Sequence, residues 1–198
     1  MKSDPWLIII GMDGGGYDAL CDEAQHHIQN ASYIIGPKRH LSMLPALGAE
    51  LAEWPVPFAD GIAQILAKRG APVVMLVSGD PFWFGGGTSI TAHLSDDDWL
   101  AIPSHSCFSL AASQLGWPLE RTHCIGLHAA PLSRIRPYLA PSQKIMATMR
   151  DGKAVQDLMR YLIEQGFGET DVTCLESLGD RGQKIRSAKA QDLCDASL

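Results

Sequence analysis

Two glycine-rich stretches that also carry acidic residues follow short apolar runs in this sequence. Residues 78–89 read SGDPFWFGGGTS and come directly after Val73–Val77. Residues 11–18 read GMDGGGYD and come directly after Leu7–Ile10. In an open parallel sheet, ligands bind beyond the carboxyl ends of the strands, and glycine lets the backbone approach a ligand closely. Both loops are therefore candidates for holding a small molecule.

The first of these loops does not fit a phosphate ligand. The dinucleotide pattern G-x-G-x-x-G would need glycine at position 13, where the sequence has Asp13. The acidic residue expected about 20 positions further on is also missing, because residues 31–40 read ASYIIGPKRH. The P-loop pattern G-x-x-x-x-G-K-[ST] does not occur in the chain either. With Asp13 and Asp18 close by, a neutral or cationic ligand suits the loop better than an anion.

Asp80, in the second loop, has two interpretations that the sequence leaves open. As an acid in a glycine turn after a strand, it could cap the helix that follows. Alternatively, it could accept a hydrogen bond from a ligand that carries an amine or a sulfonium, or balance its charge.

Composition limits the class of partner. The chain has 198 residues, enough for one large or two small domains, and 46% of them are hydrophobic, which suffices for a core. The net charge of −6 gives no general attraction to nucleic acid or to an anionic membrane. An anionic ligand would need a local cluster of Arg, Lys and His. We therefore expect a small-molecule substrate, without nucleic acid or membrane partners.

The cysteines and the N-terminus predict a cytoplasmic protein. Five cysteines are widely spaced and form no C-x-x-C pair, so free thiols are expected, with no disulfide and no metal site. Asp4 and Pro5 precede an apolar run of only four residues, which does not fit a signal peptide. No stretch approaches the roughly 20 apolar residues of a membrane span.

The order of elements predicts an α/β protein of two lobes. Strands and helices alternate in the first half, which favours a parallel sheet with crossover helices. The expected strands there are Trp6–Ile10, Ala31–Ile35 and Val73–Val77, and the expected helices Asp18–Asn30 and Phe58–Arg69. In the second half, helices Phe108–Leu115 and Val155–Glu164 are expected between shorter strands within 123–130, 143–149 and 171–179. We predict lobes at 1–103 and 104–198, the second cut before a last strand or a further domain.

Six segments together resemble a known family. They are LIIIGMDGGGYDAL, ASYIIGPKRHL, VVMLVSGDPFWFG, IPSHSCFSLAASQLGWP, LHAAPL and LESLGDRGQKI. Their order and content resemble the precorrin-6Y C5,15-methyltransferase family, specifically its carbon-5-methylating (CbiE-like) module, among the class III tetrapyrrole methyltransferases. The first loop departs from the family pattern, which is closer to G-I-G-x-D-G, because Asp13 replaces the second glycine.

The resemblance implies a fold and an activity. The expected fold has two α/β lobes, the first with a mostly parallel sheet and the second with a mixed sheet, and a cofactor cleft between them. The expected enzyme uses S-adenosylmethionine to methylate carbon 5 of precorrin-6B or its cobalt counterpart in cobalamin biosynthesis. Such a transfer depends on orientation, so no catalytic side chain is named. A homodimer or higher oligomer is expected, fused to or partnered with a carbon-15 methyltransferase and decarboxylase domain.

The resemblance also implies the site residues. The expected cofactor contacts are Gly11, Ser78, Gly79, Asp80, Trp83, Phe84, Ser106, Cys107, Leu127, Thr148 and Met149, with His128 beside Leu127. For Ser106 a helix cap is an equal interpretation, and for Leu127 and Met149 core packing is. The polycarboxylate substrate should meet positive charge at Lys38, Arg39, His40, His105 and Arg134.

Two alternatives stay open at this point. One is a related class III methyltransferase that acts on another ring carbon or, in the diphthamide-forming branch, on a protein side chain. The segments PKRHL and QLGWP favour the carbon-5 enzyme over these relatives. The other is a tetrapyrrole-binding module without turnover, for which Asp13 is a hint.

Overall fold

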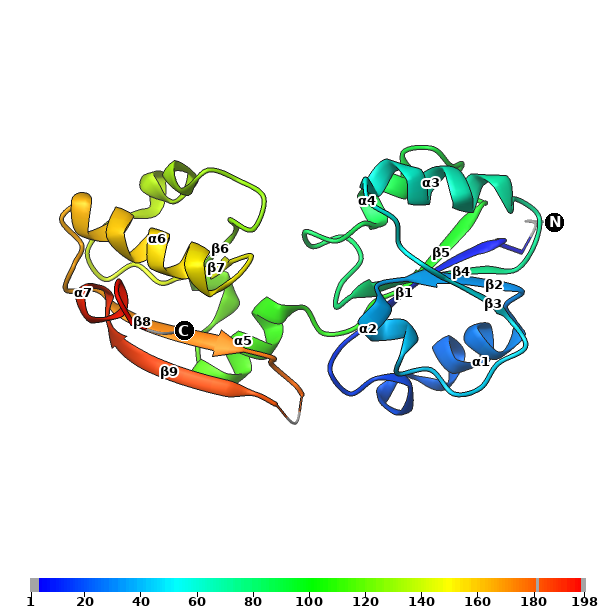
Figure 1. Ribbon diagram of the computed structural model, residues 1–198, viewed down its shortest axis with the longest axis horizontal. Helices are drawn as coiled ribbons and strands as arrows, with labels where there is room; N and C mark the ends of the chain where they lie inside the picture. Colours follow the sequence, from blue (N-terminus) through cyan, green and yellow to red (C-terminus); the bar gives the residue numbers. More distant parts are fainter. Residues whose placement is uncertain (1–3, 181, 197–198) are drawn as a thin grey trace. The chain divides into compact units, whose positions relative to one another are not determined.

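The computed structural model describes residues 4–180 and 182–196. These residues form two compact units, which Figure 1 shows as ribbons. The first unit ends at Cys107 and the second begins at Phe108. The boundary that we expected from the sequence, between residues 103 and 104, lies in the loop directly before this point.

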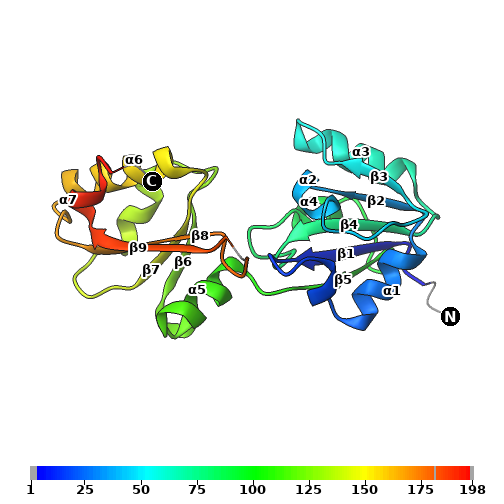
Figure 2. The ribbon, with the colours of Figure 1, turned by 60° about the horizontal axis from the view of Figure 1, so that its bottom comes forward.

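The first unit is built on a five-stranded parallel sheet, as the alternation of strands and helices predicted. The strands lie in the order β3-β2-β4-β1-β5 (Figure 2). Their bounds are β1 Leu7–Met12, β2 Tyr33–Gly36, β3 Glu50–Glu53, β4 Val73–Ser78 and β5 Trp99–Ile102. The three central strands consist mainly of β-branched and other apolar residues, because helices cover both faces of the sheet there. The three strands that the sequence predicted in this half are confirmed.

Helices on the two faces of this sheet close two separate cores (Figure 1). Helix α1 (Asp22–Asn30) buries Ile28 against one face, where α2 (Lys38–Leu41) also packs through Leu41. Helices α3 (Phe58–Ala67) and α4 (Gly87–Thr91) bury Ile65 and Ile90 against the other face. A short 3-10 turn, η1 (Tyr17–Ala19), precedes α1, so the predicted helix over 18–30 begins at Asp22.

The second unit contains two pairs of strands. Strands β6 (His123–Gly126) and β7 (Ile145–Thr148) are parallel, whereas β8 (Asp171–Glu176) and β9 (Lys184–Lys189) are antiparallel. The helical segments are α5 Cys107–Leu115, η2 Leu119–Arg121, η3 Leu132–Tyr138, α6 Gly152–Glu164 and α7 Ala190–Leu193. Helix α6 packs its buried face against Ile125 and Leu127 around β6. An α/β unit with both strand orientations is thereby confirmed.

Three strands have no counterpart among the sequence-based predictions. Strands β3 and β9 are mostly exposed, and β5 has one neighbour in its sheet, so none shows the continuous apolar run of a central strand. All three lie at the edge of a sheet or in a two-stranded pair, where half-exposed residues weaken the hydrophobic pattern.

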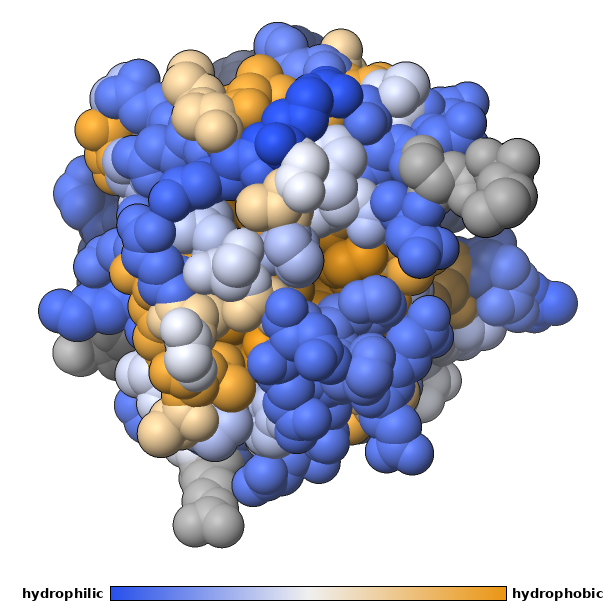
Figure 3. Space-filling model, turned by 90° about the vertical axis from the view of Figure 1, so that its right-hand side faces the viewer, coloured by the Kyte–Doolittle hydropathy of each residue, from blue (hydrophilic) through white to orange (hydrophobic). Residues whose placement is uncertain are grey.

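The remaining features of the fold are the character of its surface, the state of its cysteines and the length of its helices. On the side where β1 begins, hydrophilic residues cover most of the surface around small hydrophobic patches (Figure 3). All five cysteines are free thiols. Within the described ranges, the structure contains no helix that is both long enough and apolar enough to cross a membrane.

Candidate functional site

The backbone at Gly79 joins the carboxyl ends of three strands in the first unit. The N–H of Gly79, directly after β4, donates to the carbonyl oxygen of Met12 in β1 at 3.0 Å. Its own carbonyl oxygen accepts the N–H of Ser104, after β5, at 3.2 Å. Gly79 has a φ of +62°, and a Cβ there would lie 2.9 Å from the carbonyl oxygen of His105. Only glycine fits this position, which makes the three loops one connected edge.

Gly11, predicted as a cofactor contact, has a packing role at this edge. It is buried within β1, and a Cβ on it would overlap the carbonyl oxygen of Gly79. The same Cβ would lie 2.6 Å from the backbone nitrogen of Ser104. The absence of a side chain at Gly11 therefore lets the loops after β4 and β5 approach β1. Its contact with a cofactor stays a prediction.

The Asp80 carboxylate organises its own loop and does not cap a helix. Its Oδ1 accepts the backbone N–H of Phe82 at 2.8 Å. Helix α4 has Gly86 at its N-cap and receives no side-chain hydrogen bond there, so the helix-capping interpretation of Asp80 is wrong. Among the described residues, the other carboxylate oxygen has no hydrogen-bond or ion-pair partner. Asp80 can thus hold the loop with one oxygen and offer the other to a ligand.

Three aromatic side chains in this loop face solvent. Phe82, Trp83 and Phe84 are between 41% and 47% exposed. The Phe82 ring contacts the ring of Trp99 at 5.5 Å between centroids, and Phe84 has a φ of +57°. Large apolar side chains gathered in one exposed loop are typical of a binding surface, since solvent does not favour their exposure. The predicted cofactor contacts Trp83 and Phe84 thus lie on the accessible side of the loop.

Asp13, the departure from the family pattern, ties two loops together. Its Oδ1 accepts the backbone N–H of Gly15 at 2.9 Å, and its Oδ2 accepts the Ser104 hydroxyl at 3.1 Å. His105 Nδ1 lies 3.8 Å from the same Oδ2, and its side chain is exposed. The carboxylate therefore holds the loop after β1 to the loop after β5 through hydrogen bonds, at a position where the family pattern has glycine. Sequence reasoning missed Ser104, because this contact joins residues 91 positions apart.

Lys38 and Arg39, predicted to meet the substrate, stand free at the end of β2. Both side chains are exposed in the short helix α2. Within the part of the chain that the structure describes, neither has an ion-pair partner. The structure therefore leaves both charges available to an anionic group.

His40, the third residue of this basic segment, differs from the other two. Its side chain is 1% exposed, and burial, followed by the charge of Arg39, lowers its pKa to about 4. A neutral imidazole supplies no positive charge near pH 7, so the prediction that His40 meets the substrate as a cation is wrong. Its Nε2 lies 3.4 Å from the Oγ of Ser78, the last residue of β4. Its Nδ1 is buried and has no hydrogen-bond partner in the part of the chain that the structure describes.

Ser106 and Cys107 lie where the first unit ends. Ser106 is buried and stands directly before Cys107, the first residue of α5, which is the position of a helix cap. Cys107 is an exposed thiol. The geometry is compatible with both interpretations of Ser106, so its contact with a ligand stays a prediction.

The predicted cofactor residues of the second unit come together at the carboxyl ends of β6 and β7. The N–H of Leu127 donates to the carbonyl oxygen of Thr148 at 3.0 Å, and His128 Nδ1 lies 3.0 Å from Thr148 Oγ1. Leu127, His128 and Met149 line a cavity of about 370 Å³. Leu127 also belongs to the hydrophobic core, so the packing interpretation applies to it as well. Arg134 is exposed in η3 and does not line this cavity.

Residues at the start of α6 complete this cavity and were not predicted. Arg150, Ala154 and Asp157 line it. The Asp151 carboxylate caps α6 by accepting the N–H of Ala154 at 2.7 Å, and this bond lowers the pKa of Asp151. An aspartate directly before a helix is a known capping signal, and it could have placed the start of α6 three residues earlier than our prediction.

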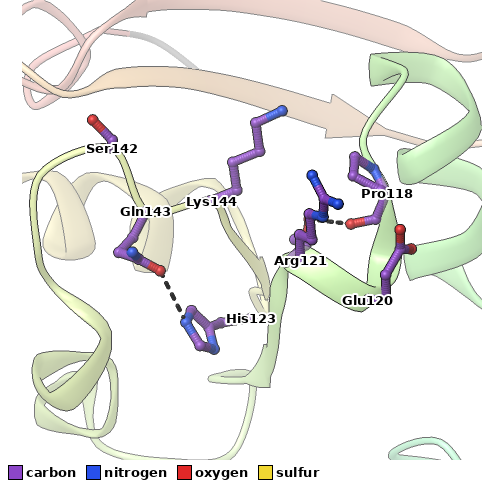
Figure 4. A pocket seen from close by; sticks show the side chains of 8 residues that line it. Pro118, Glu120, Arg121, His123, Ser142, Gln143 and Lys144 are labelled. Carbon is purple, nitrogen blue, oxygen red and sulfur yellow. Dashed lines mark hydrogen bonds between the residues drawn. The ribbon is translucent and has the colours of Figure 1, made fainter.

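A second cavity lies at the opposite ends of β6 and β7 and contains none of the predicted site residues. It encloses about 570 Å³ and is lined by Pro118, Glu120, Arg121, Thr122, His123, Ser142, Gln143 and Lys144. In Figure 4, the His123 ring faces Gln143, with 3.2 Å between Nε2 and Oε1. Every residue of the lining except Thr122 is exposed, so the cavity is an open depression at the surface.

Comparison with known proteins places the chain in a family. Residues 7–194 match the model of the family described as Tetrapyrrole (Corrin/Porphyrin) Methylases. The chain belongs to this family. The resemblance seen in the sequence is thereby confirmed at the family level, and the α/β fold with it.

Two curated relatives of this tetrapyrrole methylase differ in length. The Precorrin-6Y C(5,15)-methyltransferase [decarboxylating] of Sinorhizobium sp is 37% identical over 182 residues, covering 91% of this chain and 44% of that protein. The chain thus spans about half the length of the first curated relatives that it matches. The Cobalt-precorrin-7 C(5)-methyltransferase of Salmonella typhimurium is 26% identical over 179 residues, covering 90% of this chain and 88% of that protein.

A solved structure shows the same fold. It is the uroporphyrin-III C-methyl transferase from Thermus thermophilus, complexed with S-adenyl homocysteine. The TM-score is 0.70 at 19% identity, covering 96% of this chain and 85% of that one.

Across the described parts of this tetrapyrrole methylase, His, Cys, Asp and Glu side chains form no group of three that could hold a metal ion.

Proposed function

We propose that this chain is an S-adenosylmethionine-dependent methyltransferase that methylates carbon 5 of a precorrin or cobalt-precorrin in cobalamin biosynthesis. The family match over residues 7–194 supports the class of reaction. The relative from Salmonella typhimurium supports the position on the ring, because its name specifies C(5) and the chain covers 88% of its length. The relatives from Sinorhizobium and Mycobacterium tuberculosis support the precorrin substrate by their names.

The carboxyl edge of the first sheet fits this cofactor. A sulfonium compound with an amino-acid group presents positive charge. The loop that would hold it carries an Asp80 oxygen that has no partner among the described residues. The positive φ of Gly79 leaves backbone groups, in place of a side chain, next to the ligand. Ser78 adds a hydroxyl at the same strand end. We propose Ser78, Gly79 and Asp80 as the main contacts, with Trp83 and Phe84 as apolar walls.

The remaining cofactor contacts that the resemblance implies are kept as proposals. Ser106 and Cys107 follow the loop that contains Ser104, which is hydrogen-bonded to Gly79. In the second unit, Leu127, Thr148 and Met149 are held together by the backbone bond between Leu127 and Thr148, beside a cavity of about 370 Å³. That cavity is a candidate for the adenine group.

The chain's own residues would act through orientation. When bound, S-adenosylmethionine supplies an electrophilic methyl group. The fixed backbone around Gly79 would hold the donor in one pose, and holding reactants in line supplies much of the acceleration of such a transfer. Apolar side chains at positions 82–84 would exclude water from the reacting groups.

Lys38 and Arg39 are proposed to bind the carboxylates of the tetrapyrrole. They are exposed cations without ion-pair partners in the described ranges, next to the end of β2. A guanidinium can bind a carboxylate through two parallel hydrogen bonds, and an ammonium contributes a point charge. His105 lies beside Asp13 and would add a positive charge only in its protonated form. Arg134 is exposed in the second unit and is kept as a further candidate.

The proposal depends on the connected edge around Gly79 and on the Asp80 oxygen that has no partner within the described ranges. The experiment is a turnover assay with S-adenosylmethionine carrying a ¹³C-labelled methyl group. Precorrin-6B and cobalt-precorrin-7 are offered as substrates, and the new methyl group is located by NMR. We expect the label at carbon 5. A label at another ring carbon would favour a different member of the class, and binding of both ligands without transfer would favour a non-catalytic module.

A pair of variants tests the two functions of Asp80. Asp80→Asn keeps an oxygen that can accept the Phe82 N–H but removes the charge, whereas Asp80→Ala removes both. We expect Asp80→Ala to weaken S-adenosylhomocysteine binding about tenfold, the effect of one charge-assisted hydrogen bond, and Asp80→Asn to lie between it and the unaltered chain. Titration calorimetry measures both. Equal and unchanged affinities would limit Asp80 to shaping its loop.

The assembly and location are also proposals. We propose a homodimer or higher oligomer, which light scattering tests, and a cytoplasmic location, with which the five free thiols agree. We propose that carbon-15 methylation and decarboxylation belong to a fused domain or partner, because the relatives named for both positions are about twice as long as this chain.

A further inference from the structure

The buried ring of His40 is poorly explained by stability alone. An imidazole that is 1% exposed and has one unpartnered nitrogen loses hydrogen bonds to water without replacing them. An unsatisfied buried polar group of this kind destabilises a fold, and each such group in a native protein needs an explanation. A leucine at this position would bury a similar volume without the penalty. The histidine is therefore expected to serve something other than packing.

Among the described residues, the one side-chain hydrogen-bond partner of His40 is Ser78, at the end of β4. Its Nε2 lies 3.4 Å from Ser78 Oγ, and within the described ranges this is the only side-chain partner of the Ser78 hydroxyl. Ser78 is exposed, whereas His40 is buried. The hydroxyl thus lies between a closed environment on the histidine side and an open one on the other side. A group on the open side can bind it.

The arrangement of protons follows from the unpartnered nitrogen. If the Ser78 hydroxyl donated to Nε2, then Nδ1 would carry the hydrogen and would be a buried donor without an acceptor. If Nε2 carries the hydrogen and donates to Ser78 Oγ, then Nδ1 is a bare acceptor. Buried N–H groups without partners are rarer in proteins than under-satisfied acceptors. The second arrangement is therefore favoured, and it leaves the Ser78 hydroxyl hydrogen available to a ligand.

We propose that His40 is a positioning residue that donates from Nε2 to Ser78 Oγ and thereby turns the Ser78 hydroxyl into a hydrogen-bond donor for the cofactor. The inference rests on the proposed function, because it concerns the loop that would hold S-adenosylmethionine. The ligand group that Ser78 meets is an acceptor, such as a carboxylate or hydroxyl oxygen. His40 itself touches neither the cofactor nor the substrate.

Calorimetric titration with S-adenosylhomocysteine tests the coupling between the two residues. A hydrogen bond of ordinary net strength predicts that Ser78→Ala and His40→Leu each raise the Kd about fivefold. Because both variants remove the same interaction, the double variant should also bind about fivefold more weakly, where independent effects would give about 25-fold. Unchanged binding by His40→Leu, or effects that multiply in the double variant, would overturn the inference.

Two further variants separate positioning from folding. His40→Gln can place an amide N–H near the position of Nε2, so we expect it to bind within about twofold of the unaltered chain. His93→Leu, at an exposed histidine, is the matched control and should bind normally. Urea unfolding shows which variants are folded. If His40→Leu does not fold, His40→Gln is compared with the shorter His40→Asn, and equal weakening by both would contradict the inference.

NMR spectroscopy can determine, without any ligand, which ring nitrogen of His40 carries the hydrogen. Long-range ¹H–¹⁵N NMR spectra of the unaltered chain at pH 7 should show His40 protonated on Nε2 and bare on Nδ1. The opposite tautomer would overturn the inference. If the unaltered chain does not bind S-adenosylhomocysteine, the proposed function and the role of Ser78 fail together. If it binds and His40→Leu binds equally well, the inference alone fails.

Discussion

The parallel sheet of the first unit has an amino edge, where its strands begin, and a carboxyl edge, where they end. The charged residues at these two edges differ in how completely they are paired. At the amino edge, the cations Lys68 and Arg69 each pair with a carboxylate. Lys68 Nζ lies 2.8 Å from Glu50, the first residue of β3, and 4.6 Å from the centroid of the Tyr33 ring. Arg69 contacts both oxygens of Asp98 at 2.9 Å and lies 5.4 Å from the Trp6 ring.

Asp98 is the centre of the amino edge. Its carboxylate accepts from the backbone and hydroxyl of Ser95, the indole of Trp6 and the guanidinium of Arg69. The hydrogen bonds from Ser95, with further ones from Trp6 and Arg69, hold the pKa of Asp98 well below its usual range. Its polar atoms are occupied by the protein itself, so this edge can offer little to a ligand.

At the carboxyl edge, Asp13 is bonded to Gly15 and Ser104, but several other polar and charged groups keep atoms without a partner in the described residues. Lys38 and Arg39 have no ion pair among residues 4–180 and 182–196, Asp80 has one free oxygen, and the Nδ1 of His40 is unpaired. Three aromatic side chains are exposed in the same region. The difference indicates that the amino edge stabilises the fold, whereas the carboxyl edge retains interactions that a bound molecule can complete.

The strongest test of this comparison is Gly11→Ala. The new Cβ would overlap the carbonyl oxygen of Gly79, so the backbone at the carboxyl edge must shift. We expect a loss of about 3 kcal/mol in the free energy of unfolding, the upper part of the range for overpacking, and a loss of cofactor binding of more than tenfold. Urea unfolding and calorimetry measure the two effects. Gly48→Ala, where an added Cβ meets nothing within 4 Å, is the control and should change neither.

The buried His40 predicts a pH dependence of stability. The unfolded chain takes up a proton near pH 6.5, whereas the folded chain resists protonation until about pH 4. Stability therefore falls as the pH falls from 6.5 towards 4, by up to about 3 kcal/mol for this group. His40→Gln should remove this part of the decrease. Urea unfolding at several pH values compares the two chains, and parallel curves would show that His40 is not buried as a neutral group.

Asp98→Asn tests the amino edge. The amide group of asparagine would present hydrogens to Ser95 or Arg69, which are themselves donors, so several bonds must weaken. We expect a lower free energy of unfolding at pH 7 and unchanged affinity for S-adenosylhomocysteine in the folded fraction. Thermal unfolding and calorimetry measure these quantities. A folded variant with weakened cofactor affinity would contradict the claim that the amino edge stabilises the fold without contributing to ligand binding.

The smallest expected effect comes from the free cations. Lys38→Ala combined with Arg39→Ala should leave stability and cofactor affinity unchanged, because neither side chain has an ion pair with any described residue. Binding of precorrin-6B should weaken about threefold or more, as expected for the loss of exposed charge contacts of modest strength. Fluorescence titration measures it. A parallel loss of cofactor affinity would indicate a disturbed β2 end and would contradict the assigned role.

The sequence predicted the central strands and the glycine loop but not the details of pairing. Val73–Val77 and Leu7–Ile10 are continuous apolar runs, which is the expected pattern of strands that are buried on both faces. Strand β9 carries mostly exposed polar residues, so it has no such pattern. The segment 38–40 reads as three equal cations, and only the packing of α2 shows that one of them is buried and neutral.

In the candidate site as well, local features were predictable from the sequence and contacts between distant residues were not. Asp80 could be singled out because an acid and glycines directly after an apolar run need a special backbone and a reason for the charge. The bond between Asp13 and Ser104 joins residues 91 positions apart and depends on the neighbouring positions of β1 and β5. No local sequence pattern predicts such a contact. The hydrogen bond that Asp13 makes at the position of a family glycine could therefore be seen only in the structure.

The most direct test of the contrast between the two edges is an NMR titration of the ¹⁵N-labelled chain with S-adenosylhomocysteine. We expect shifts of the backbone amides of Gly79 and Asp80 at the carboxyl edge. The indole N–H of Trp6, which is bonded to Asp98 at the amino edge, should stay unchanged. Absence of shifts at Gly79 and Asp80, or shifts centred on Trp6, would contradict the assignment of the carboxyl edge as the ligand site.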